Sequence, residues 1–334
     1  MTTLRLGTRG SQLALYQANT VASLLQSAAG IACEVVVIRT SGDRLADAPL
    51  ADVGGKRLFV KEIEDALLGG VVDLAVHSSK DMPAVLPEGL SLGGVLPRAD
   101  ARDAIVLPLH DAANGSAPGS RGARPASLDQ ITARLGPSPR IGTSSIRRTA
   151  QLARLFPAAR FAPIRGNLDT RLRKVDAREY DALVLASAGL IRLGHESRIS
   201  FALPPDTCIP APGQGIIAIE VRTGDPTTTA VVEKINDPAA TAALTAERAV
   251  VTRLGGGCQM PIGAHAAESP DGLTLTAIVI SVDGVRSARA VARGERAEAA
   301  SLGARVADDL LARGAGDILG EVEQARATVE GLQP

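Results

Sequence analysis

The sequence predicts an α/β protein with two similar domains, followed by a smaller α+β domain with an antiparallel sheet. Short apolar strands alternate with amphipathic helices over residues 4–77, as in a parallel sheet covered by helices. The same order of segments returns over residues 140–187. From residue 238 onward the pattern changes to a helix and then a strand of alternating apolar and polar residues, which favours an antiparallel sheet.

Local patterns define the elements of the first unit in chain order. Ser11 is placed to cap its first helix, and the β-branched run at 34–40 is typical of a strand buried on both faces. Residues 41–57 are rich in Gly, Asp and Ala and predict a loop. We expect the strands to pair in parallel. The predicted strands and helices cover residues 4–7, 12–27, 34–40, 59–68 and 71–77.

The second unit repeats the first at three places that occur in the same order. In both copies, the first of these places is followed by a Ser and a helix. Internal similarity in a constant order indicates a duplicated domain, and chance similarity between short apolar strings is the alternative. The matching pairs are 5–8 with 140–143, 35–39 with 161–165, and 73–76 with 181–186.

Two connecting segments set the domain boundaries. Residues 111–127 have low complexity and predict a surface insertion. Residues 203–215 are rich in Pro and Gly, and we expect the apolar strand at 216–221 to return to the first domain. The chain then divides into a first domain (1–105 and 216–237), a second domain (106–215) and a third domain (238–334).

The third domain combines helices with a hairpin. A helix is predicted around 241–254, and an alternating strand covers 273–282. Asp283-Gly284 is typical of a hairpin turn before a second strand that ends at Arg293. A closing helix carries apolar residues on one face, namely Leu302, Val306 and Leu310.

The composition of the 334-residue chain excludes several classes of protein. Its 36 basic and 36 acidic residues cancel, and aromatic residues make up only 2%, so a nucleic-acid-binding surface is not expected. Three widely spaced Cys and four isolated His show no metal-ligand spacing. No apolar run is long enough to cross a membrane, and the N-terminus shows no secretory signal. We therefore expect a cytoplasmic protein without a metal site.

The strongest candidate site is the start of a helix at residues 142–148. A strand ends there, Ser144 and Ser145 follow, and the helix opens with Arg147 and Arg148. Free N–H groups at a helix start, together with guanidinium groups, favour an anion. The alternative is a Ser cap followed by solvated Arg.

The charge of the segment that follows weakens this alternative. Residues 147–178 hold nine basic and two acidic residues, and such a local excess in a neutral protein needs a counter-ion. Arg165 and Arg171 flank a Gly-Asn turn and could converge on the same place.

Lys80 and Asp81 form the second candidate, directly after the strand that ends at His77. In open α/β sheets, ligands bind at the carboxyl ends of strands. Asp81 could therefore give or take a proton, or stabilise a cation. A turn with a capping Asp is the alternative.

Two glycine-rich motifs complete the candidates. Gly54-Gly55 precedes Lys56 and an amphipathic helix, which is a weak indication of a flexible lid; the spacing is not that of a P-loop. Three Gly precede Cys258 and leave its thiol sterically open, which favours a reactive or modified Cys. A tight turn with an incidental Cys is the alternative.

Taken together, these motifs resemble the porphobilinogen deaminase (hydroxymethylbilane synthase) family over nearly the whole chain. The resemblance implies two domains similar to type II periplasmic binding proteins and a third domain that carries the Cys. It implies a transferase that condenses four porphobilinogen molecules head to tail, with loss of ammonia at each step, and then hydrolyses the product to a linear tetrapyrrole. The matching motifs lie at residues 8–11, 54–59, 77–81, 142–148, 165–171, 188–192, 213–215 and 256–259.

The resemblance also implies a role for each matching residue. A dipyrromethane cofactor is attached to Cys258 by a thioether. Asp81 is the catalytic residue and stabilises the azafulvene cation that is left when ammonia departs. Each pyrrole ring brings acetate and propionate groups, which Arg can hold by paired, charge-assisted bonds. The further cofactor-binding residues are Lys80, Ser144, Ser145, Arg147 and Arg148, and the substrate-binding residues are Arg9, Ser11, Lys56, Phe59, Arg165, Arg171, Arg192 and Gln214.

Departures from the family pattern are modest. Arg57 follows Lys56 where many relatives carry Gly, and Ser79 stands where the residue is often apolar. We expect a monomer whose partner is porphobilinogen. The alternative is a periplasmic-type anion-binding protein without catalysis, which the missing signal peptide and the third domain disfavour. A nucleic-acid-binding protein is disfavoured by the neutral charge and the scarce aromatic residues.

Overall fold

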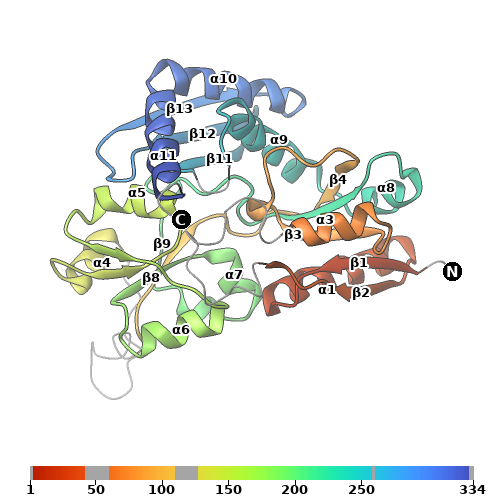
Figure 1. Cartoon of the computed structure of the whole chain (residues 1–334), viewed down its shortest axis with the longest axis horizontal. Coiled ribbons are helices and arrows are strands. Elements are labelled where there is room, and N and C mark those ends of the chain that lie inside the picture. Colours follow the sequence, from red (N-terminus) through yellow and green to blue (C-terminus); the bar gives the residue numbers. More distant parts are fainter. Residues whose placement is uncertain (1–2, 42–59, 110–126, 258–259, 331–334) are drawn as a thin grey trace.

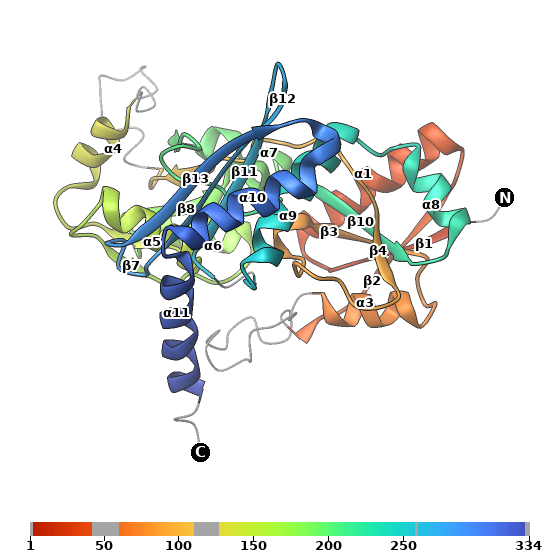
Figure 2. The same cartoon turned by 90° about the horizontal axis from the view of Figure 1, so that it is seen from above.

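The computed structural model describes residues 3–41, 60–109, 127–257 and 260–330 of the chain. These residues form three units, each built on its own sheet (Figure 1). Two α/β units lie side by side, and the third contacts both of them (Figures 1 and 2). The predicted class, two similar α/β domains and a smaller α+β domain, is confirmed.

The sheet of the first domain has five strands in the order β2-β1-β3-β10-β4. The first three strands pair in parallel as predicted, but β10 is antiparallel to both β3 and β4. The parallel pairing expected for the strands of residues 4–77 is therefore confirmed, and the antiparallel strand is the one that returns from the second domain. The chain returns from the second domain opposite Ser78, where β3 ends, so β10 must run back along β3. The strands are β1 (Leu4–Thr8), β2 (Cys33–Val37), β3 (Leu74–Ser78), β4 (Leu90–Val95) and β10 (Ile217–Arg222).

The second domain has the same plan, with the strand order β7-β6-β8-β5-β9. Its β6, β7 and β8 are parallel and occupy the places of β1, β2 and β3. Here β5 is the antiparallel strand: its pairings with β8 and with β9 are both antiparallel. The internal repeat is therefore real. The strands are β5 (Asp103–Val106), β6 (Arg140–Gly142), β7 (Arg160–Ala162), β8 (Ala182–Ala186) and β9 (Phe201–Ala202).

The two α/β domains exchange strands, and this shifts one boundary. The proposed division between residues 105 and 106 falls inside β5, which belongs to the second sheet. We place the boundary before Asp103. The return of the chain to the first sheet agrees with the expected strand at 216–221, since β10 covers Ile217–Arg222.

Helices cover the sheets of the two α/β domains. Leu25 of α1 packs against one side of the first sheet, and Ile63 of α3 packs against the other, which explains the continuous apolar runs of its strands. The first sheet is covered by α1 (Gln12–Ala29), α3 (Lys61–Leu68) and α8 (Pro226–Glu233). The helices of the second domain are α4 (Leu128–Leu135), α5 (Ile146–Leu155), α6 (Leu168–Asp176) and α7 (Ser187–Arg192). Each domain also has a short 3₁₀ turn: η2 (Ser79–Asp81) in the first, η3 (Glu196–Arg198) in the second and η4 (Arg296–Glu298) in the third.

The third domain packs an antiparallel sheet of three strands against helices. The predicted hairpin is present, and its turn at Gly284 lies against α5 of the second domain, where a Cβ would come within 2.7 Å of the Ala150 carbonyl oxygen. Two elements were not predicted: β11, and a last helix, α11, that extends away from the molecule (Figure 2). The elements are α9 (Pro238–Arg253), β11 (Ile262–Ser269), β12 (Gly272–Ile280), β13 (Ser287–Gly294), α10 (Ala299–Ala312) and α11 (Ala315–Glu330).

Candidate active site

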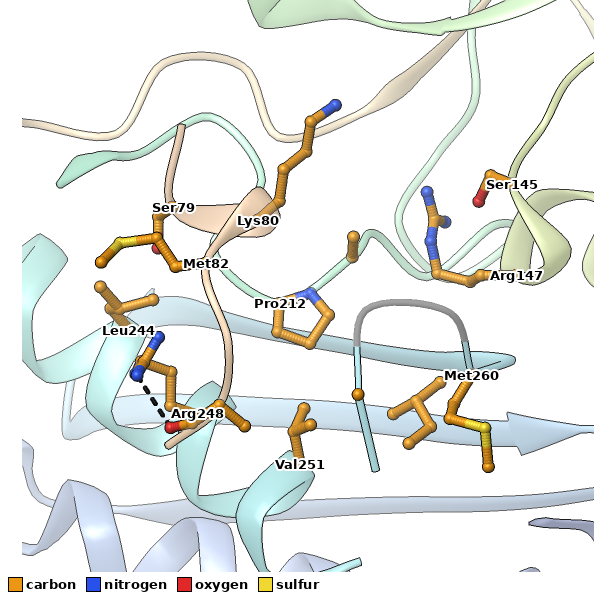
Figure 3. A pocket seen from close by; sticks show the side chains of 14 residues that line it. Ser79, Lys80, Met82, Ser145, Arg147, Pro212, Leu244, Arg248, Val251 and Met260 are labelled. Atoms are coloured by element: carbon orange, nitrogen blue, oxygen red, sulfur yellow. Dashed lines mark hydrogen bonds between the residues drawn. The ribbon is translucent and has the colours of Figure 1, made fainter. Parts of the chain in front are cut away.

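A pocket of about 70 Å³ lies where the three domains meet (Figure 3). Lys80 comes from the turn after β3, Arg147 from α5, and Leu244, Val251 and Met260 from the third domain. Lys80 and Arg147 both extend away from the three apolar residues, whereas Arg248 of α9 lies between Leu244 and Val251 (Figure 3). The carboxyl end of β3 and the start of α5 are therefore brought together, as the positions of ligand sites in α/β sheets lead one to expect.

The turn η2 positions Lys80 and Asp81 at the edge of the first sheet. Asp81 is exposed, and Lys80 is half-buried. Burial lowers the pKa of Lys80 to about 8, with Asp81 opposing the shift and Arg148 adding to it. Lys80 therefore lies among other cations, and a negatively charged ligand would favour its protonated form.

Arg147 and Arg148 are buried at the start of α5, only 4% and 7% exposed. Ser145 caps the helix, and its Oγ accepts from the N–H of Arg148. Both guanidinium groups bind one internal carboxylate, that of Asp103: Arg147 Nη1 at 2.7 Å and Arg148 Nε at 2.9 Å. Part of the negative charge expected to balance this basic segment therefore comes from Asp103, which the sequence analysis did not identify.

Arg165 and Arg171 approach the same place, as their positions around the Gly-Asn turn suggested. Burial lowers the pKa of Arg171, and the neighbouring Arg148 and Arg165 lower it further, while Asp81 opposes them. Arg171 Nε donates to the Gly166 carbonyl oxygen at 2.8 Å, which fixes the turn against α6. Arg148, Arg165 and Asp81 are therefore all near enough to Arg171 to act on its charge.

The hydroxyl groups of Ser11 and Ser144 are engaged with the backbone. Ser11 Oγ accepts from the N–H of Ala14 at 3.3 Å and caps α1 as predicted. Ser144 Oγ donates to the carbonyl oxygen of Ile164 at 2.7 Å and accepts from its N–H at 3.0 Å. Both residues hold a loop at the end of a strand, and ligand binding by them stays a prediction.

Arg9, Arg192 and Gln214 lie at different places around the interdomain junction. Arg9 is half-buried directly after β1. Arg192 donates to the carbonyl oxygen of Gly215 at 2.7 Å, and burial lowers its pKa. Gln214 is fully buried and donates to the Ala101 carbonyl oxygen at 2.6 Å. In this structure Arg192 and Gln214 fix the segment between the two domains.

Three predicted site residues, Lys56, Phe59 and Cys258, lie outside the described residues. Of the described residues that flank the cysteine motif, Gly256 and Gly257 precede it and Met260 follows it. The motif needs glycine at Gly256, where a Cβ would come within 2.4 Å of Ile262 Cδ1. Gly257 and Met260 are the described residues of this motif that line the pocket.

Glu247 of α9 is a second residue that the sequence analysis missed. Its side chain is completely buried and accepts hydrogen bonds from residues of all three domains. Oε1 accepts from Arg98 Nη2 at 2.8 Å and from the N–H of Ala266 at 2.7 Å. Oε2 accepts from the N–H of Gly213 at 2.7 Å. A lone Glu on the apolar side of an Ala-rich helix is the signal that could have indicated this role.

The described part of the chain has no candidate for two other kinds of site. There, no group of three or more His, Cys, Asp and Glu side chains is placed to hold a metal ion. No described helix is long and apolar enough to cross a membrane.

The fold and the pocket define an α/β protein of two similar domains and a third domain, with a pocket that holds Lys80 and Arg147 where they meet. Comparison with known families gives the particular family. Residues 4–230 match the family described as "Porphobilinogen deaminase, dipyromethane cofactor binding domain", and residues 241–312 match "Porphobilinogen deaminase, C-terminal domain". The chain therefore belongs to the porphobilinogen deaminase family, whose members are transferases of tetrapyrrole biosynthesis.

Curated relatives agree with this assignment over almost the full length. The porphobilinogen deaminase of Geobacter metallireducens is 46% identical, covering 98% of this chain and 97% of the relative. That of Syntrophobacter fumaroxidans is 44% identical, covering 96% and 98%.

Solved structures with a similar fold include binding proteins. The periplasmic VFT2 domain of Bordetella pertussis BvgS is 17% identical, with a TM-score of 0.39 over 70% of this chain and 86% of that one. An ancestral cationic amino acid solute binding protein is 16% identical, with a TM-score of 0.41 over 69% and 86%.

Proposed function

We propose that this chain is an enzyme that joins four porphobilinogen molecules head to tail, releases ammonia at each step, and hydrolyses the product to hydroxymethylbilane. The observation that carries the proposal is the family match over both parts of the chain, combined with a pocket lined by Lys80, Arg147 and Gly257. A monomeric, cytoplasmic protein that acts without nucleic acid or membrane belongs to the same proposal, and size-exclusion chromatography with light scattering tests its oligomeric state.

The residues of the pocket suit a dipyrromethane cofactor attached to Cys258. That group carries several carboxylates. The cations near the pocket repel one another, because the charges of Arg148 and Arg147 both lower the pKa of Lys80, and a bound carboxylate would offset this repulsion. Arg147 also has a buried Nε without a hydrogen-bond partner among the described residues. Lys80, Ser145, Arg147 and Arg148 would hold the carboxylates. When bound, the cofactor supplies the pyrrole end to which substrate is joined.

Asp81 acts on the substrate in this proposal. Its carboxylate is exposed at the end of β3, and its charge reaches both Lys80 and Arg171. As ammonia leaves the aminomethyl group, positive charge spreads over the substrate's pyrrole ring. A fixed carboxylate beside the ring N–H stabilises that charge without having to reorganise.

The remaining cations would orient the substrate by its carboxylates. Arg165 and Arg171 are grouped with Asp81, so an acetate or propionate group held by them places the ring beside the carboxylate. Arg9, Ser11, Arg192 and Gln214 would complete the binding surface, and Lys56 and Phe59 would close over it.

Intact mass of the purified full-length protein tests the proposal. The parent chain should be heavier than its sequence by one dipyrromethane, and C258S should lose both the added mass and the release of ammonia from porphobilinogen. C33S, which changes a half-buried thiol on β2, is the matched control and should keep both. A fully active parent with unmodified Cys258 would contradict the mechanism, and porphobilinogen binding without ammonia release would support the anion-binding alternative.

A further inference from the structure

Asp103 lies at the start of β5 with no exposed surface, and both of its carboxylate oxygens are occupied. Oδ2 accepts from Arg147 Nη1 at 2.7 Å and lies 3.4 Å from the thiol of Cys208. Oδ1 accepts from Arg148 Nε and from Gln214 Nε2, both at 2.9 Å. A single carboxylate therefore joins β5, α5 and the segment that returns to the first domain.

The hydrogen bonds around the two guanidinium groups fix their orientation. Arg147 Nη1 also donates to the carbonyl oxygen of Ile209 at 2.7 Å, and Arg148 Nη1 donates to that of Val184 at 3.0 Å. Buried charges are held only where partners offset their lost hydration. Because Asp103 supplies one negative charge for two positive ones, the cluster keeps a net positive charge, which is available to an anion.

We propose that Asp103 is a positioning residue of the anion site, which holds the guanidinium groups of Arg147 and Arg148 in one arrangement against the segment that contains Gln214. This inference rests on the proposed function, since the anion is taken to be a carboxylate of cofactor or substrate. Asp103 is fully buried, so it acts through the groups that it holds and not by contact with the anion.

The same carboxylate influences Lys80, and this gives the proposal a measurable signature. Burial lowers the pKa of Lys80, Asp81 and Asp103 raise it, and Arg148 and Arg147 lower it. Replacing Asp103 by Asn removes one raising influence and leaves both lowering ones. The pKa of Lys80 must then fall further.

The test compares D103N, D103E and D176N in the full-length protein. Asp176 pairs with Arg198 at 2.7 Å in the same domain, so D176N is a matched loss of an Asp–Arg pair outside the pocket. Only a neutral amine reacts with acetic anhydride, so the rate at which Lys80 is acetylated at each pH, measured by peptide mass spectrometry, gives a midpoint. Steady-state kinetics with porphobilinogen give KM and kcat for the same samples.

We expect D103N to lower the Lys80 midpoint and to raise KM about tenfold, with a smaller change in kcat, because loss of a hydrogen bond between charged groups has about this effect. D103E should keep the midpoint, since the charge is retained, but raise KM, since the longer side chain displaces the guanidinium groups. D176N should lower only the temperature of unfolding. A parental midpoint and KM in D103N would overturn the proposal.

Two further outcomes are also decisive. If D103N does not fold, D103E decides alone: an increased KM at an unchanged midpoint supports the positioning role, and a parental KM overturns it. Failure of the proposed function is distinguishable, because the parent chain then lacks added mass and turnover while the Lys80 midpoints of parent and variants can still be compared.

Discussion

Replacing Glu247 by Ala should cost more stability than any surface substitution in the chain. Glu247 is fully buried, and its carboxylate accepts from Arg98 and from the N–H groups of Gly213 and Ala266. The Arg98 side chain is only 15% exposed, so E247A leaves a nearly buried cation without its partner. Breaking such a pair costs about 3–5 kcal/mol, and each orphaned N–H adds about 1–3 kcal/mol. We expect the free energy of unfolding to fall by at least about 4 kcal/mol.

Urea denaturation followed by circular dichroism measures this loss. E268Q is the control, because Glu268 pairs with Arg296 at the surface with both side chains half exposed, and such pairs contribute about 1 kcal/mol or less. In a double-mutant cycle, R98A combined with E247A should cost clearly less than the two single losses added together. A loss in E247A no larger than that in E268Q would refute the view that Glu247 joins the three domains.

Three further substitutions test the site. D81A should lower kcat by at least about 100-fold while KM changes little, as measured by ammonia release. Since the pKa of Lys80 is about 8, KM should rise in the parent as pH rises through 8 and its charge is lost, and K80Q should abolish this dependence. Between about pH 8 and 10.5, Lys80 is protonated in the unfolded chain but mostly neutral in the folded one. The contribution of Lys80 to the free energy of unfolding therefore increases as the pH rises through this range. G213A should lower the free energy of unfolding by about 2–4 kcal/mol, since φ is +72° and a Cβ would lie 2.4 Å from Ser79 Oγ; G224A, with a similar φ of +82° and open space, should cost about 1 kcal/mol.

The repeat of the two α/β domains could be predicted from the sequence, but the direction of their central strands could not. Apolar residues such as Ile105 and Ile219 are buried whichever way their strand runs. Direction depends on the side of the sheet from which the chain arrives, and that is decided by the exchange of β5 and β10 between domains.

Two elements of the third domain escaped prediction for local reasons. β11 contains Gly263, Ala264 and Ala266, which have little preference for strands; pairing with β12 along its whole length makes it a strand. Gly314, with φ +87°, marks the end of α10. The chain nevertheless continues into α11, whose Ile318 and Leu319 are buried in the third core.

The candidate site was predictable where one segment held several signals. Arg147 and Arg148 could be identified because two Ser, a strand end and a helix start surround them. Asp103 could not, because it lies 44 residues from Arg147 along the chain and no motif marks it among the neighbouring charged residues Asp100 and Arg102. Only the tertiary fold brings this carboxylate under the two guanidinium groups.

The exchange of strands also affects how the chain is made. Ser78 at the end of β3 pairs with Ile217 of β10. The ribosome must therefore add 139 further residues after Ser78 before β10 can begin to pair with β3 and complete the first sheet. At about 5–20 residues per second, ribosomal synthesis of that stretch takes roughly 7–28 seconds. During this time the β3 edge has no neighbour, and open edges of this kind are where nascent chains aggregate. The N-terminal half is therefore the part of this protein for which protection by a chaperone during translation matters most.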